Sequence, residues 1–462
     1  MKQKETINTN DNVTEGYKNP MGYAPILPLI MKMSVPSIFA MLISALYNIV
    51  DSIYVARLSE TALSAVSLVY PVQLMNVAIV VGTGVGLSSL ISRRLGEKRI
   101  DAAQNAVNHG IILCNLEYIL FLLFGLFGSA PFCLAFSEPG PLVEQAITYC
   151  KIVCVGSIFI FNAQSVEKIM QSSGNMLFPM LAQLSGTITN IILDPIMIFG
   201  KFGCPALGVA GAAYATIIGQ FVAMLAAYVL LYIGKFPVRL SFKNFKFHMQ
   251  TVKDIYQVGI PAMVMQAITS VTTVFLNKIL IAFSETAVAV LGVYFKLQSF
   301  AFMPIFGMNQ GVMPIMGFNY GAKNKKRLMT TLKYSLFIAV GFMIVVTLLF
   351  QFIPETLMSL FNPSEDMMAM GVKALKIISI CFPFAACGVI PGAMFQATAH
   401  GTISMYNSIL RQLVVIIPAA YILSGIMGVD GVWWAYPCAE IMSLTFTSIM
   451  LIRLYNKELK YL

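Results

Sequence analysis

The stretch that decides the fold is 187-TITNIILDP-195, because it sets an acid inside an apolar run. The run extends from Leu177 to Phe199, which is long enough for an α-helix to cross a bilayer. Asp194 therefore lies at membrane depth, where a charged side chain costs about 2.5–3.5 kcal/mol on insertion scales. We interpret this acid as functional in preference to a structural partner of a neighbouring helix.

Other polar groups share the helical face of this acid. Asn190 lies four residues before Asp194 and Thr187 lies seven before it, so the three side chains fall on one side of the helix. Pro195 has no N–H, which leaves the carbonyl of Ile191 without its helical partner. All of these groups offer oxygen atoms, which suit a proton or a hard cation such as Na⁺ better than a soft metal.

The composition is that of an integral membrane protein. Of the 462 residues, 58% are hydrophobic and 11% are charged, whereas a soluble domain has about 25% charged residues. Apolar runs of about 20 or more residues predict an all-α protein with twelve transmembrane helices. We place these helices at residues 28–56, 62–91, 106–130, 143–170, 177–200, 208–233, 254–282, 287–316, 330–353, 369–397, 404–425 and 431–454.

The basic residues are distributed unevenly between the two sides of the membrane. Twelve spans place both termini on one side, where we count 20 Lys and Arg residues, with Lys168 included at the end of the fourth span. The opposite side has two, Arg57 and Lys201. The positive-inside rule makes the basic side cytoplasmic. None of the basic patches is dense or interleaved with aromatic residues, so we expect no nucleic-acid partner.

Sequence signals for an enzyme are missing. The chain has no Gly-rich loop ending in Lys-Ser/Thr, and its three histidines, His109, His248 and His400, are widely spaced. The eight cysteines have no paired spacing, so we interpret them as small core residues. We expect a transporter without a cofactor rather than an enzyme.

An internal repeat divides the chain into two halves. At a shift of 225 residues, Ser59-Glu-Thr-Ala62 falls on Ser284-Glu-Thr-Ala287, and residues 34–98 contain 11 identities. Two bundles of six helices then enter the membrane in the same orientation, related by an axis along the membrane normal, around a central cleft. The predicted parts are a disordered cytoplasmic tail (1–25), an N-terminal bundle (26–234), a cytoplasmic linker (235–253), a C-terminal bundle (254–455) and a cytoplasmic tail (456–462).

The deep acids break this symmetry. Asp51 in the first span falls opposite Leu276, and Asp194 falls opposite Ile417. Both acids therefore belong to the first half, which favours one dedicated site in the N-terminal bundle.

We expect the first, fifth and sixth spans to meet at that site. Asp51, Asn190, Asp194 and Thr216 would then form a cage of oxygen atoms. Two carboxylates close together in a low dielectric cannot both ionise readily, so the pair would take up a proton or Na⁺. The expected supporting polar residues are Tyr47, Asn48, Thr187 and Tyr214.

The motifs resemble the multidrug and toxic compound extrusion (MATE) family, and look closest to its prokaryotic DNA-damage-inducible branch. They are Asn48-Ile-Val-Asp51, Gln171-Ser-Ser-Gly174, Asn190-Ile-Ile-Leu-Asp194-Pro195 and Gly208-Val-Ala-Gly-Ala-Ala-Tyr-Ala-Thr216. The resemblance implies a V-shaped pair of bundles that exchanges drug for H⁺ or Na⁺. It also places the family's cation site on Asp51, Asn190, Asp194 and Thr216.

The family's other branch has acids in the seventh and tenth spans. Here Lys278 lies in the seventh span, and the tenth has no acid in its interior, so we expect no second coupling site. Lys296 either lines the central cavity or pairs with an acid such as Glu440. The candidates for lining a substrate cavity are Gln73, Gln171, Lys296, Gln298 and Gln396.

The predicted function is secondary active export. The resemblance implies antiport of drug-like amphipathic or cationic compounds against H⁺ or Na⁺ by alternating access, in a monomer that spans the plasma membrane. The alternative is a flippase for lipid-linked precursors from the same superfamily. Lys278 and Lys296 keep that alternative open, because a flippase favours a cationic cavity for pyrophosphate, whereas the paired acids oppose it.

Overall fold

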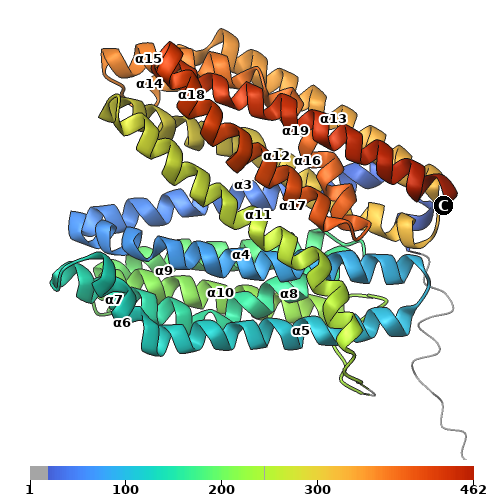
Figure 1. The fold of residues 1–462 in the computed structure, drawn as a ribbon. Helices are drawn as coiled ribbons and strands as arrows, with labels where there is room; N and C mark the ends of the chain where they lie inside the picture. Colours follow the sequence, from blue (N-terminus) through green and yellow to red (C-terminus); the bar gives the residue numbers. More distant parts are fainter. Residues whose placement is uncertain (1–18, 244) are drawn as a thin grey trace, which may run out of the picture.

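The computed structural model describes residues 19–243 and 245–462, except for the side chains of Asn48, Ile49 and Ala56. The expected role of Asn48 therefore lies outside the described residues. The described chain is helical and contains no strand. Figure 1 shows two helical bundles that diverge at one end and converge at the end that holds the C-terminus.

The helices follow the predicted spans closely. The first bundle contains α3 (Ile26–Leu58), α4 (Glu60–Gly96), α5 (Ile100–Leu123), α6 (Ser129–Phe136), α7 (Pro141–Gly156), α8 (Ile158–Ser172), α9 (Leu177–Phe199) and α10 (Val209–Ile233). The second contains α11 (Met249–Ile281), α12 (Glu285–Gly321), α13 (Lys325–Phe352), α14 (Pro354–Ser359), α15 (Glu365–Ser379), α16 (Phe382–Ala397), α17 (Gly401–Ile409), α18 (Ile417–Met427) and α19 (Val429–Lys457). Short π-helices, Phe124–Gly128 and Leu410–Ile416, join α5 to α6 and α17 to α18.

The prediction of twelve spans is confirmed. In the described part of the chain, ten helices or helix runs are long and apolar enough to cross a membrane, and two bent pairs bring the number to twelve. The bent pairs are α7–α8, with an angle of 41°, and α15–α16, with an angle of 48°. Each pair forms the fourth span of its bundle, so the bends repeat as the sequence does.

The repeated motif Ser-Glu-Thr-Ala starts the second helix of each bundle. The side chain of Ser59 accepts a hydrogen bond from the backbone N–H of Ala62 at 3.0 Å, and Ser284 accepts one from Ala287 at the same distance. A serine N-cap satisfies an N–H that the first helical turn leaves unpaired. The acid after each serine favours the positive end of the helix dipole.

Glycines hold the two bundles together where they converge. A Cβ atom on Gly86 of α4 would lie 2.1 Å from the carbonyl oxygen of Ile255 on α11, and one on Gly311 of α12 would lie 2.9 Å from atoms of Met33 and Ser34 on α3. Gly86 and Gly311 are equivalent in the repeat, so the two contacts between bundles are pseudo-symmetric. Small residues permit this close approach of membrane helices.

The segment before α3 departs from the prediction of a disordered tail at 1–25, of which residues 1–18 lie outside the described residues. Residues 19–25 were expected to belong to a disordered tail, but Pro20–Tyr23 form the helix α2, and Met21 is fully buried. The backbone oxygen of Met21 accepts hydrogen bonds from Asn319 and Arg327 of the second bundle, while Asn19 donates one to Ser173 of the first. These contacts order the segment because they satisfy its backbone. At the other terminus, α19 continues to Lys457, and Leu459 is buried.

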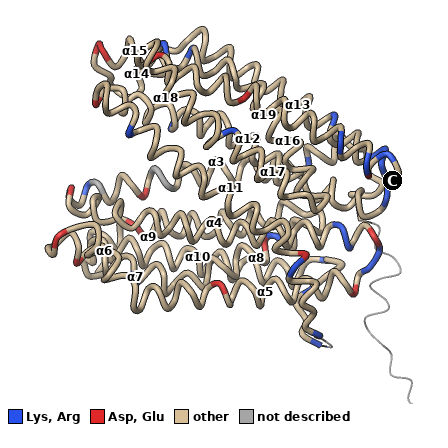
Figure 2. The backbone as a smooth tube through the Cα atoms, viewed as in Figure 1, with Lys and Arg blue, Asp and Glu red and all other residues tan. Residues whose placement is uncertain are grey.

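The linker between the bundles packs on the first bundle. Asn108 of α5 donates a hydrogen bond to the carbonyl of Ser241, and Phe236 and Val238 are buried. The helix α11 begins at Met249, five residues before the predicted boundary of 254. Figure 2 shows that Lys and Arg gather at the end of the molecule that holds the C-terminus.

We predict that Gly86→Ala lowers the thermal stability, because the new methyl group forces α4 and α11 apart. Gly292→Ala is the matched control, since a methyl group on this exposed helical glycine would meet no other atom within 4 Å. That control should be neutral or stabilising, because Ala is better than Gly in a helix by about 1 kcal/mol. Thermal unfolding of the purified protein measures both, and equal midpoints would contradict a tight contact at Gly86.

Candidate functional site

The helix α9 carries the two polar residues at the centre of the site. Asn190 and Asp194 lie one turn apart and are 3% and 0% exposed. The side-chain amide of Asn190 donates to Asp194 Oδ1 at 3.5 Å and to Thr216 Oγ1 of α10 at 3.4 Å. One amide group therefore connects the acid on α9 with the hydroxyl on α10.

Close packing of α9 and α10 makes that connection possible. A Cβ atom on Gly186 would lie 2.6 Å from the carbonyl oxygen of Gly219, and one on Gly219 would lie 2.8 Å from that of Gly186. The small residues Gly186 and Gly219 therefore allow a close approach of the two helices, which brings Thr216 to Asn190.

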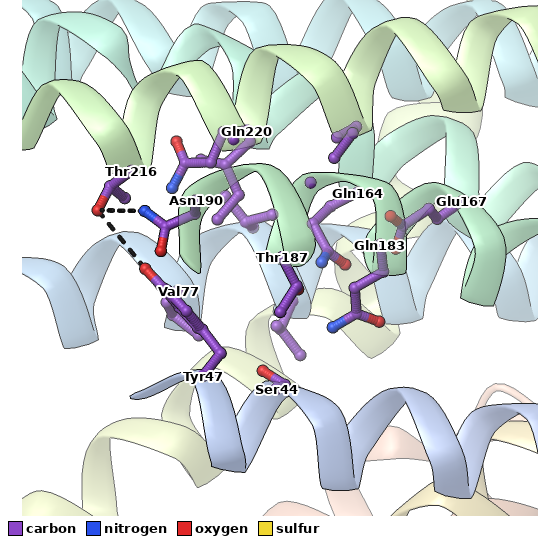
Figure 3. Close-up of a pocket in the computed structure, with 17 residues that line it drawn as sticks. Ser44, Tyr47, Val77, Gln164, Glu167, Gln183, Thr187, Asn190, Thr216 and Gln220 are labelled. Atoms are coloured by element: carbon purple, nitrogen blue, oxygen red, sulfur yellow. Dashed lines mark hydrogen bonds between the residues drawn. The ribbon is translucent and has the colours of Figure 1, made fainter. Parts of the chain in front are cut away.

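The helix α3 supplies the remaining groups. The hydroxyl of Tyr47 lies 3.5 Å from Thr216 Oγ1, as Figure 3 shows. One turn further along, the carboxyl group of Asp51 is within hydrogen-bonding reach of the carboxyl group of Asp194. The structure thus brings together all four residues of the expected cage, from the first, fifth and sixth spans.

Several oxygen atoms of the cage have no hydrogen-bond partner among the described residues. These atoms are Asp51 Oδ1, Asn190 Oδ1 and Asp194 Oδ2, all of them buried. Neither acid forms an ion pair within the described chain. Buried polar atoms without partners are costly, and bound protons or a hard cation would satisfy these oxygens. The set of two carboxyls, an amide and a hydroxyl fits Na⁺ or a proton.

A cavity of about 240 Å³ lies beside the cage, within the first bundle. Figure 3 shows Tyr47, Asn190 and Thr216 at one end and Gln164, Glu167 and Gln183 at the other. Its other lining residues are Ser44, Val77, Val80, Val81, Ile160, Ala163, Gly186, Thr187, Gly219, Gln220 and Ala223. The cavity connects the expected cation site with the three polar side chains at its other end, through a largely apolar wall.

The supporting residues are only partly placed as predicted. Thr187 lines the cavity. Tyr214 does not, because its side chain is 43% exposed on another face of α10. Two residues along a helix are about 200° apart, so Tyr214 and Thr216 cannot face the same site.

None of the five expected cavity residues lines this cavity. Gln73 donates to the hydroxyl of Tyr149 at 2.9 Å, and Tyr149 in turn lies near Asp51. Gln73 is therefore linked to the acids through Tyr149. Gln171 accepts a hydrogen bond from Lys168. Gln396 contacts the sulfur of Met265, and Gln298 is half-buried.

Of the two predicted roles of Lys296, the ion pair with Glu440 is wrong. Lys296 is exposed, and its ammonium lies 5.7 Å from the ring centroid of Phe361. Glu440 instead pairs with Arg411, at 2.9 Å between Nη1 and Oε1.

Sequence reasoning missed Glu167 and misplaced Lys168. Lys168 was counted among the basic residues at a membrane surface, but it is 6% exposed, and its ammonium donates to Gln171 at 2.9 Å and to Gln310 of the second bundle at 3.2 Å. Glu167 faces the cavity. The signal available in the sequence was an acid next to a base at the end of an apolar run, where hydropathy alone leaves the membrane boundary ambiguous.

The comparisons with known proteins agree with the repeat. A family model described as MatE matches residues 36–196 and again residues 261–422. The two matches start 225 residues apart, which is the shift found in the sequence. The multidrug export protein MepA of Staphylococcus aureus is 28% identical over 435 residues, which cover 93% of this chain and 94% of that protein. MepA of Staphylococcus haemolyticus is 27% identical and covers 94% of each chain.

Solved structures share the fold. The outward-facing conformation of a multidrug resistance MATE family transporter of the MOP superfamily has a TM-score of 0.87 at 27% identity, and the match covers 99% of this chain and 100% of that one. A crystal structure of MATE in the bent conformation has a TM-score of 0.86 at 27% identity, with 98% of this chain and 99% of that one covered.

We predict that Arg411→Met destabilises the protein by about 3 kcal/mol, because it leaves Glu440 buried without its partner. This value is at the low end for breaking a buried pair, since the Arg411 side chain is 27% exposed. The double variant Arg411→Met with Glu440→Leu should recover most of the loss, because no charge is left unpaired. Unfolding of the variants in detergent checks this, and additive losses would contradict a coupled pair.

Proposed function

The chain belongs to the MatE family, and on this premise we propose that it is a secondary exporter that antiports drug-like amphipathic or cationic compounds against H⁺ or Na⁺. It is a multi-pass membrane transporter and not an enzyme. The observation that carries the proposal is the pair of acids, the half-buried Asp51 and the buried Asp194, beside a cavity. The lack of acids inside the seventh and tenth spans supports placement near the prokaryotic DNA-damage-inducible branch.

The proposed coupling works through the position of α3. With a cation or protons bound, Asp51 and Asp194 no longer repel each other, so α3 can move closer to α9. Tyr47 moves with α3 and is linked through Thr216 to α10. Since Tyr47 and Asn190 both line the cavity, this movement reduces the space for substrate at that end. Ion binding and substrate binding then exclude each other, which antiport requires.

Alternating access would follow from rocking of the two bundles. The convergent end holds the C-terminus and most of the basic residues, and we assign it to the cytoplasm by the positive-inside rule. The divergent end then faces outward. We propose a monomer in the plasma membrane with both termini cytoplasmic.

The flippase alternative is not favoured. A cavity for a pyrophosphate headgroup should be lined by cations, whereas this cavity contains Glu167 and adjoins the two aspartates. Lys296 does not line it but rests on Phe361.

We predict that Asp51→Asn and Asp194→Asn each abolish ion-driven efflux, because an amide cannot bind and release the coupling ion. Efflux of ethidium, a fluorescent cation, from proteoliposomes under a pH gradient or a Na⁺ gradient alone measures this and identifies the ion. Asp101→Asn is the matched control, since Asp101 is exposed in the first turn of α5. Efflux by Asp194→Asn at the wild-type rate would remove Asp194 from the mechanism.

A further inference from the structure

A third buried acid, Glu117 of α5, belongs neither to the cage nor to the cavity. Its side chain is 7% exposed. Oε1 accepts hydrogen bonds from the hydroxyl of Thr83 at 2.5 Å and from the hydroxyl of Tyr256 at 2.7 Å. Oε2 is buried and has no partner among the described residues. One oxygen therefore binds two donors, while the other is available to a proton.

The hydrogen bond from Tyr256 crosses from one bundle to the other. Glu117 and Thr83 belong to the first bundle, and Tyr256 lies two turns into α11, the first helix of the second. Ile255, the residue before Tyr256, makes the close contact with Gly86 of α4. Glu117 thus fastens α11 to the first bundle at the convergent end.

The neighbours of Glu117 do not neutralise its charge. The titratable groups that interact with it are the phenol of Tyr256 and the thiol of Cys114 on its own helix. From α4 it meets the hydroxyl of Thr83, and from α8 the hydroxyl of Ser165 reaches Cys114. None of these groups is cationic, and no ion pair of Glu117 is found in the described chain. The protonation state of Glu117 therefore changes the net charge of this contact.

Packing of the bundles does not require an acid here. At the shift of 225 residues, Glu117, Thr83 and Tyr256 correspond to Phe342, Met308 and Met31. The pseudo-equivalent contact between α3 and α12 keeps its glycine, Gly311, but is apolar at all three of these positions. The acid is thus specific to one of two otherwise similar contacts.

We infer that Glu117, with Thr83 and Tyr256, is a second proton-binding site, which holds the convergent end closed when ionised and releases it when protonated. The ionised carboxylate is the stronger acceptor, because hydrogen bonds to a charged group are roughly twice as strong as neutral ones. A proton taken up at Oε2 leaves Oε1 as a neutral acceptor and weakens the hold on Tyr256. The inference rests on the proposed function in one respect, that this end opens during transport.

The test measures opening of the convergent end and needs no transport. Spin labels on Asp101→Cys and Lys326→Cys, exposed residues of the two bundles, report the distance between the first turns of α5 and α13. The accessible native thiols are first removed by Cys204→Ser, Cys387→Ala and Cys438→Ser. Double electron–electron resonance on the full-length protein in lipid then measures the ratio of open to closed populations, once at acidic pH and once at neutral pH.

At neutral pH, Tyr256→Phe and Glu117→Gln should each raise this ratio by ~10-fold or more, as expected for loss or weakening of a hydrogen bond to a charged group. Acid should raise the ratio in the wild type and have a smaller effect in both variants. Tyr228→Phe is the matched control, because its hydroxyl donates to Asn162 at 2.9 Å within the first bundle. It should behave as the wild type does.

The Asp194→Asn background separates this inference from the proposed function. If Glu117 acts as inferred, its pH response persists there, even though the cage no longer binds its ion. If Tyr256→Phe folds, shows the wild-type population at neutral pH and keeps the full response to acid, the inference is overturned. Should Glu117→Gln not fold, Tyr256→Phe alone decides, since it leaves the acid in place.

Discussion

Two carboxyl groups that face each other away from water impose the main constraint on this molecule. Asp51 and Asp194 lie within hydrogen-bonding reach, and each has an oxygen without a partner in the described chain. In such surroundings two negative charges are unstable without a proton or a cation between them. The neighbouring helices support that arrangement in two ways: Gly186 and Gly219 let α10 pack closely on α9, and Asn190 connects Asp194 to Thr216.

The two bundles share a framework and differ in chemistry. The same serine caps, bent fourth spans and glycine contacts occur in both, because the backbone geometry of each half depends on them. The two acids of the cage and Glu117 belong to the first half, and their repeat equivalents are apolar. The acid pair is thus an asymmetric feature on an otherwise symmetric scaffold, as the proposed single coupling site requires.

Much of this could be predicted from the sequence. Apolar runs located the twelve spans, the repeat located the two bundles, and helical spacing brought Asn190 and Asp194 together. The remaining features depend on helix rotation and on contacts between distant segments. The prediction that Tyr214 supports the site was wrong because this side chain lies on another face of α10. The placement of Lys168 at a membrane surface was wrong because its partner Gln310 comes from the other bundle. Glu167 was missed because spacing along one helix does not reveal which face borders a cavity.

The central claim is that Asp51 and Asp194 form one ion-binding unit. Difference infrared spectroscopy of the purified protein in lipid, titrated with pH, detects protonated carboxyl groups and measures this directly. Two coupled acids titrate as a pair, so Asp51→Asn and Asp194→Asn should each abolish the same titrating signal, and the double variant should add nothing further. Two independent signals, each removed by one substitution and unaffected by the other, would contradict the account.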